Sequence, residues 1–324
     1  MVQSLIAAMQ NEIPFDVIKR DLELPLDSGQ IITILRVRRC GKSSLMMLAI
    51  NVLIEKGVRK EQILKKAFVE YNQSGAFPEV VFIPQKSMKE RKLQTYFNTM
   101  LFRDLIEHYK LSNPGLVRYF LKRIMSNLSK PTSIHAIYND IKSQGLKVSK
   151  DKLYELADHA CSIFLFFRVS KYDKSIIKEN NSFSKYYCID NGMRNAVLLP
   201  QSGDEGKLLE NTVFLNLRRN CGPADKIYYY QGAKKCDFVL QQNEEITHLI
   251  QVSWTIADDE TRKREIDGLV EASRMTECKN LLIITHDEDD EIIESEATIK
   301  VVSAWKWLLA YNRSEKEIKK SGWV

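Results

Sequence analysis

The chain has 324 residues, of which 44% are hydrophobic and 28% are charged. This composition excludes a wholly disordered, collagen-like or coiled-coil protein, and the length allows about two or three domains of ordinary size. Lys and Arg outnumber Asp and Glu by 48 to 42, a net charge of +6. So small a basic excess permits a nucleic-acid or other polyanionic partner without requiring one.

Six cysteines are scattered along the chain without a CxxC pair, which favours neither a zinc site nor a disulfide framework. The N-terminus lacks a basic stretch followed by a long apolar run, so no secretory signal is visible. The apolar run at residues 163–167 is far shorter than the roughly 18 residues of a membrane span. We therefore expect a cytoplasmic protein with no membrane partner.

A strand at residues 30–35, a compact basic loop and a helix at residues 43–56 form the order that a phosphate-binding loop requires. In such a loop, backbone N–H groups hold the phosphates, Lys42 reaches the outer phosphates and Ser43 binds Mg²⁺. The motif GxxxxGK[ST] has glycine where this chain has Arg36, so we expect weakened ATP binding. The residues expected to contact ATP are Arg39, Cys40, Gly41, Lys42, Ser43 and Ser44.

The strands that should follow this loop in an ATPase are missing. Only enough residues for about one βαβ unit separate the loop helix from residues 75–78, and they contain no hydrophobic strand that ends in an acid. The hydrophobic run at residues 281–285, followed by acids, is interpreted as a core strand that enters a solvated loop. We therefore expect ATP hydrolysis to be impaired.

The middle of the chain has the outline of a winged helix. Three helices and then two strands are predicted, at residues 115–128, 133–144, 149–162, 164–169 and 185–189. The lysines of the expected wing are Lys171, Lys174, Lys178 and Lys185. They favour contacts to the DNA backbone rather than base readout, and a protein-interaction module is the alternative.

The last region is predicted to be mixed α/β. Helices are expected at residues 205–219 and 260–273, and strands at residues 226–230, 236–240, 247–254, 280–285 and 299–302. Trp305 and Trp307, followed by Leu308-Leu309, indicate a terminal amphipathic helix that packs on the core.

The ordered series of motifs resembles archaeal and bacterial AAA-superfamily ATPases that carry a C-terminal domain of unknown function. The segments that carry the resemblance are residues 31–43, 70–71, 75–79, 103–104, 185–192, 206–211 and 237–238. The resemblance implies an ATP-binding protein with Mg²⁺ as cofactor. In that family the strands with the magnesium acid and sensor precede the segment equivalent to residues 75–79, so most of the ATPase core is deleted here.

The C-terminal region is also similar to the PD-(D/E)xK nuclease fold. That resemblance implies a metal site at Glu210, Asp237 and the triplet Gln251-Val252-Ser253, with Asp237 as a magnesium ligand. Gln251 supplies no charge and Ser253 replaces the lysine, so the site looks degenerate, although Lys234 or Lys235 could supply a migrated amine.

We therefore predict an α/β multidomain protein in four parts. These are a partial P-loop segment (1–66), a helical linker region (67–112), a winged-helix-like domain (113–199) and a nuclease-like domain (200–324). The predicted function is ATP binding with a DNA-associated C-terminal half. The alternatives are a magnesium-dependent nuclease, or a noncatalytic interaction module or degenerate gene product. Self-association or a protein partner is the alternative to DNA.

Overall fold

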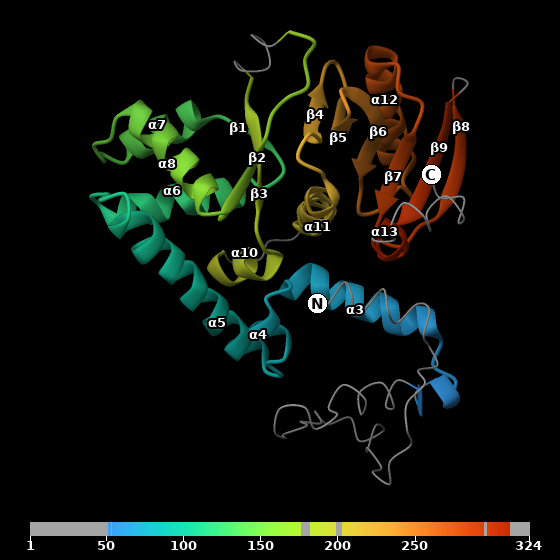
Figure 1. The fold of residues 1–324 in the computed structure, drawn as a ribbon, viewed down its shortest axis with the longest axis horizontal. Helices are drawn as coiled ribbons and strands as arrows, with labels where there is room; N and C mark the ends of the chain where they lie inside the picture. Colours follow the sequence, from blue (N-terminus) through green and yellow to red (C-terminus); the bar gives the residue numbers. More distant parts are fainter. Residues whose placement is uncertain (1–50, 53, 176–181, 199–202, 295–296, 312–324) are drawn as a thin grey trace.

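The computed structural model describes residues 51–52, 54–175, 182–198, 203–294 and 297–311. The predicted phosphate-binding loop, with Lys42 and Ser43, lies outside the described residues. The described part is mixed α/β, as expected: a helical group and a small sheet lie on one side of α11, and a larger sheet lies on the other (Figure 1). None of its helices is long and apolar enough to cross a membrane.

The helical group contains the predicted middle helices. Its members are α4 (Pro78–Val81), α5 (Lys86–Thr99), the π-helix η1 (Met100–Glu107), α6 (Pro114–Ser126), α7 (Ile134–Ser143), α8 (Lys150–Ser162) and α10 (Asn191–Val197). Asn113, Ser133 and Ser149 cap α6, α7 and α8 by accepting a hydrogen bond from a backbone N–H of the first turn. The apolar faces of these helices share one core, in which Phe120, Leu121 and Ile124 are fully buried.

The small sheet has one strand more than predicted. Its order is β1 (Pro131–Thr132), β3 (Ser184–Cys188) and β2 (Phe166–Val169), all antiparallel. The register pairs Phe166 with Cys188 and Val169 with Lys185. The short strand β1 comes directly before α7 and pairs with the β3 end that carries Lys185.

The larger sheet has six strands in the order β4-β5-β6-β7-β9-β8. Their bounds are β4 (Lys226–Gln231), β5 (Lys235–Gln242), β6 (Glu245–Val252), β7 (Leu281–Thr285), β8 (Asp290–Glu294) and β9 (Ala297–Ser303). The central pairs β6–β7 and β7–β9 are parallel and the outer pairs are antiparallel. Asn243 and Glu244 both have positive φ and form the tight turn between β5 and β6. Strand β8 was not among the strands predicted from the sequence.

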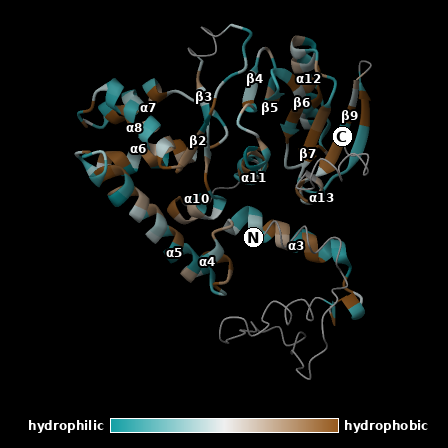
Figure 2. Cartoon of the chain, in the orientation of Figure 1, coloured by the Kyte–Doolittle hydropathy of each residue, from teal (hydrophilic) through white to brown (hydrophobic). Residues whose placement is uncertain are grey.

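Helices cover both faces of this sheet. Alternate side chains of β5 point to opposite faces: Phe238 packs with α11 (Glu205–Asn220) and α13 (Ala304–Tyr311), whereas Val239 packs with α12 (Asp259–Thr276). Hydrophobic residues are concentrated in the central strands between these layers (Figure 2). Gly268 lets α12 approach the sheet, because a Cβ there would lie 2.1 Å from the Lys235 carbonyl oxygen.

A helix that the sequence analysis did not predict, α3 (Lys60–Ser74), joins the two parts. It runs across the expected boundary between residues 66 and 67, and its buried Leu64 and Phe68 belong to the core around α11 and α13. Lys65 forms an ion pair of 2.7 Å with Asp287, in the loop after β7. Residues on both sides of the boundary predicted between the P-loop segment and the helical linker therefore pack in the core of the C-terminal region.

Candidate functional site

The structure brings Glu210, Asp237 and Gln251 together where α11 faces the sheet. Glu210 lies in the middle of α11, Asp237 near the start of β5, and Gln251 near the end of β6. The Gln251 side-chain oxygen accepts a hydrogen bond of 3.0 Å from the Asp237 backbone N–H. The sequence therefore identified three residues that do form one cluster.

Lys185 completes the cluster, and it comes from β3 of the small sheet. Its Nζ lies 2.9 Å from Glu210 Oε1 and 3.0 Å from Asp237 Oδ1. The Tyr187 hydroxyl donates a hydrogen bond of 2.7 Å to the same Glu210 oxygen, and the ring of Tyr229 lies 5.4 Å from Nζ. A single ammonium group thus connects the two carboxylates across the two parts of the molecule.

Asp237 and Gln251 also have partners beyond Lys185. Asp237 Oδ2 accepts a hydrogen bond of 3.2 Å from the Val252 N–H. The Gln251 amide donates to Glu265, whose other oxygen accepts from Arg264 at 2.7 Å. Gln251 therefore orients its neighbours and has no oxygen directed at a ligand.

This cluster is closed to solvent. Lys185 is 4% exposed, Glu210 7% and Asp237 1%. A phosphodiester that is to be hydrolysed must touch the groups that act on it, and here those groups are covered by protein. The described arrangement is therefore a buried ion-pair network.

The pKa values follow from burial and from the three charges. Burial alone would lower the pKa of Lys185, but Asp237 and Glu210 raise it above its usual range. Burial and the charge of Asp237 raise the pKa of Glu210, against the effect of Lys185. Burial also opposes ionisation of Asp237, but Lys185 and Lys235 hold the pKa of Asp237 below its usual value. Of the two carboxyl groups, Glu210 is therefore the one that takes up a proton first as the pH falls.

A magnesium ion does not fit this arrangement. The Lys185 ammonium already lies between the carboxylates that would have to bind the metal, and Gln251 contributes no charge. Within the part of the chain that the structure describes, no group of three or more His, Cys, Asp or Glu side chains could hold a metal ion.

Lys185 is the amine that contacts both carboxylates of the cluster. Neither of the two lysines proposed from the sequence, Lys234 and Lys235, takes this place. Lys234 pairs with Asp267 at 3.2 Å, and the half-exposed Lys235 remains 3.8 Å from Asp237. Ser253 donates its hydroxyl hydrogen bond to the Thr255 carbonyl. The sequence places Lys185 among the wing lysines that would contact DNA, whereas in the structure its side chain is buried in this cluster. The spacing of Lys185 and Tyr187 on one face of a strand is the sequence signal that was available.

Comparisons with known proteins give relatives but no activity. Residues 65–204 match the family model described as "Domain of unknown function (DUF8612)". The chain is similar to an uncharacterized protein of Methanocaldococcus jannaschii, with 30% identity over 264 residues that cover 78% of this chain and 58% of that protein. It is also similar to an uncharacterized protein of Haemophilus influenzae, with 24% identity over 313 residues that cover 95% and 74%. The chain thus spans less than two thirds of the first relative. No solved structure matches it.

Proposed function

We propose that this protein is an ATP-binding protein of the AAA type whose C-terminal half associates with DNA without cleaving it. The observation that carries the absence of cleavage is the Lys185 ammonium, buried between Glu210 and Asp237. The nucleotide part rests on the motif at residues 39–44 and its resemblance to AAA-type ATPases. Helices on both faces of the β4–β9 sheet, with Glu210 and Asp237 in the expected places, support a nuclease-like fold. The Lys185 cation lies where a nuclease of this fold would bind its metal ion, which supports the absence of metal-dependent cleavage.

Support for DNA association comes from the middle of the molecule. Three capped helices followed by the β2–β3 hairpin are compatible with a winged helix, in which the third helix and the wing contact DNA. Lys150 and Lys152 begin the third helix, α8, and Lys171 and Lys174 follow β2. Contacts of this kind go to phosphates and carry no sequence information.

For DNA, we expect binding without cleavage. Fluorescence anisotropy with a labelled duplex should show an affinity that falls steeply as salt is raised, because phosphate contacts release counterions. Incubation of the same duplex with protein and Mg²⁺ should leave it intact. The Asp237→Asn variant should give the same result in both measurements. Absence of duplex binding at low salt would contradict the DNA part of the proposal.

A magnesium-dependent nuclease is the second candidate, and one observation favours it. Lys185 provides, next to Asp237 and Glu210, the amine that Ser253 cannot provide. For this activity the cluster would have to open, since it is closed in the described structure. Mg²⁺-dependent cleavage that Asp237→Asn abolishes would establish the nuclease and overturn the noncatalytic proposal.

For ATP, we expect stabilisation that depends on Lys42. A ligand that binds only the folded state raises the melting temperature in proportion to the logarithm of its concentration above Kd. Thermal melting with Mg²⁺ and ATP should therefore shift upward, and Lys42→Ala should remove the shift. Arg36→Gly, which restores the glycine of the motif, should enlarge it. Equal melting temperatures with and without millimolar ATP would exclude the nucleotide part of the proposal.

A further inference from the structure

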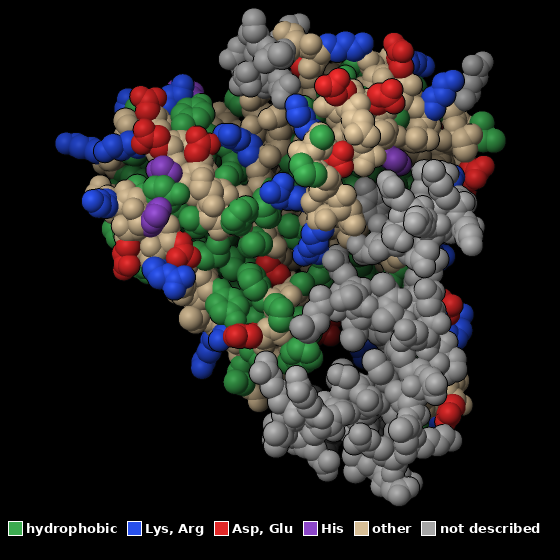
Figure 3. All heavy atoms as spheres, viewed as in Figure 1, with side chains coloured by type: hydrophobic (Ala, Val, Ile, Leu, Met, Phe, Trp, Pro, Cys, Tyr) green, Lys and Arg blue, Asp and Glu red, His purple; other side chains and the backbone are tan. Residues whose placement is uncertain are grey.

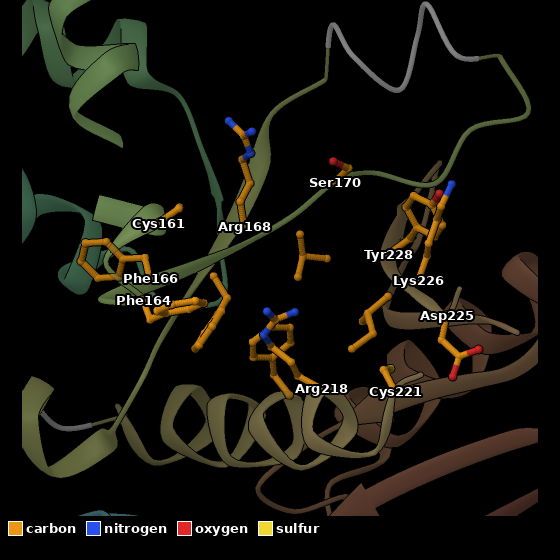
Figure 4. Close-up of a pocket in the computed structure, with 14 residues that line it drawn as sticks. Cys161, Phe164, Phe166, Arg168, Ser170, Arg218, Cys221, Asp225, Lys226 and Tyr228 are labelled. Carbon is orange, nitrogen blue, oxygen red and sulfur yellow. The ribbon is translucent and has the colours of Figure 1, made fainter. Parts of the chain in front are cut away.

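A cavity lies between β2 and the C-terminal end of α11, away from the Lys185 cluster. It has a volume of about 430 Å³ and adjoins a second hollow of about 770 Å³. Phe164, Phe167 and Arg218 line both hollows. Figure 4 shows the first of them. Volumes of this size are typical of sites for small organic ligands.

Phe164 presents its ring to this cavity from an unusual backbone conformation. It follows the end of α8 with φ of +61°, and its side chain is 57% exposed. Its N–H donates to the Cys161 carbonyl and the Leu165 N–H to the Ala160 carbonyl, the pattern of a helix end at which glycine is usual. A bulky residue is strained there, and an exposed ring gains little from burial. For folding alone, glycine would suit this position better than phenylalanine. The phenyl ring is therefore better explained by a contact with a ligand than by the stability of the fold.

Arg218 is the cation at the centre of the cavity. It projects from α11 (Figure 4). Its guanidinium lies 4.6 Å from the centre of the Phe167 ring. The Arg168 guanidinium points away from Arg218 in that view and pairs with Asp158 at 2.7 Å. Arg218 is thus held against an aromatic face and remains available to an anion.

The rim of the cavity adds positive charge. Arg219 and Lys226 are exposed beside Arg218, and Arg219 donates a hydrogen bond to the hydroxyl of Tyr71. The acid at this rim, Asp225, accepts a hydrogen bond of 2.8 Å from the Gly222 N–H. Lys and Arg side chains lie next to hydrophobic ones around the place that α11 takes in Figure 1 (Figure 3). Aromatic faces and cations that form no ion pair within the described part of the chain therefore share one concave surface.

We propose that this cavity binds a nucleotide of single-stranded DNA, with the base stacked on Phe164 and the phosphate paired with Arg218. Proteins that bind single strands combine exposed aromatic rings with a cationic groove, because every base has a π-face and every linkage a charge. In a duplex the bases are stacked on each other and cannot reach the ring. The proposal rests on the DNA association proposed above and adds to its duplex contacts a site for a single strand on this surface.

The experiment measures binding of a fluorescent oligothymidylate to the full chain by anisotropy. Phe164→Gly should weaken binding about tenfold, the effect of losing one stacked base. The melting temperature should not fall, because glycine suits this backbone conformation. Phe82→Ala, which removes another exposed phenyl ring at the end of α4, is the control and should leave the affinity unchanged. Arg218→Gln should also weaken binding and make it less dependent on salt.

The outcomes separate this inference from the proposed function. If Phe164→Gly and Arg218→Gln bind oligothymidylate as the wild type does, the cavity assignment is wrong and DNA association stands. If thymidine monophosphate binds as tightly as the oligonucleotide, the site is one for free nucleotides and the assignment to single strands is overturned. If the wild type binds neither single strands nor duplex, both proposals fall. Should Phe164→Gly lower the melting temperature, the exposed Arg218→Gln keeps the test decisive.

Discussion

Lys185→Met is expected to lower the free energy of unfolding by about 3–5 kcal/mol, the usual cost of removing one partner from a buried ion pair. The substitution leaves the carboxylates of Glu210 and Asp237 covered by protein without the cation that lies within 3.0 Å of both. Urea unfolding at pH 7, followed by circular dichroism, measures the loss. The same substitution removes the ion pair between Lys185 of β3 and Glu210 of α11.

Lys235→Met is the matched control. This lysine stands 3.8 Å from the same Asp237, but its side chain is 47% exposed. Exposed pairs contribute only about 0–1 kcal/mol, because water screens them. A second variant, Lys185→Met with Glu210→Gln and Asp237→Asn, should recover part of the loss, since no buried carboxylate is then left unpaired. Equal stability of the two single variants would show that the Lys185 network does not hold the fold together.

The secondary structure was predictable wherever the pattern was local. The helices predicted to start at Ser133 and Ser149 are α7 and α8, and these two serines cap them. The strands predicted at residues 236–240 and 247–254 form the β5–β6 hairpin, in which Asp237 lies beside Gln251. The edge strand β8 was missed because three of its five residues are acidic, a composition that favours a solvated loop. The helix α3 was not predicted, because its N-cap is Arg59 and none of the usual capping residues marks its start.

The candidate site was only partly predictable for a different reason. Glu210, Asp237 and Gln251 belong to one sheet and the helix packed on it, so the order of elements brings them together. Lys185 comes from a separate sheet, and its approach depends on how β3 packs against α11. No local periodicity encodes such a contact between parts. In the sequence, Lys185 looks like the lysines of the loop between β2 and β3, and such lysines are usually exposed to solvent.

The second large effect is a dependence of stability on pH at Asp190, which joins the end of α3 to α10. Its carboxylate accepts hydrogen bonds of 2.7 Å from the Ala76 N–H and 2.8 Å from the Met193 N–H. Gly192 lies so close to α3 that a Cβ would meet the Ser74 carbonyl oxygen at 2.0 Å. In this closely packed junction, burial raises the pKa of Asp190 from 3.8 to about 6.

The sign follows from proton binding. Between pH 4 and 6 the folded state holds a proton on Asp190 that the unfolded state has released, so stability falls as the pH rises through this window. A shift from 3.8 to about 6 corresponds to a loss of about 3 kcal/mol at pH 7. Asp190→Asn cannot ionise and keeps an oxygen that can cap α10. Its stability relative to wild type should therefore rise by about that amount between pH 4 and 7.

Urea unfolding of both proteins across this pH range measures the difference, and changes at all other titrating groups cancel in it. Asp258→Asn is a control for which the expected change of stability with pH has the opposite sign. Asp258 caps α12 on the surface, and its hydrogen bond of 2.8 Å from the Thr261 N–H lowers its pKa. Its contribution is present above the unfolded pKa and is lost as the pH falls, so this variant should lose stability relative to wild type as the pH rises. If the Asp190→Asn difference stays constant with pH, or follows the trend of Asp258→Asn, then the backbone donors around Asp190 outweigh its burial and the carboxylate is ionised throughout.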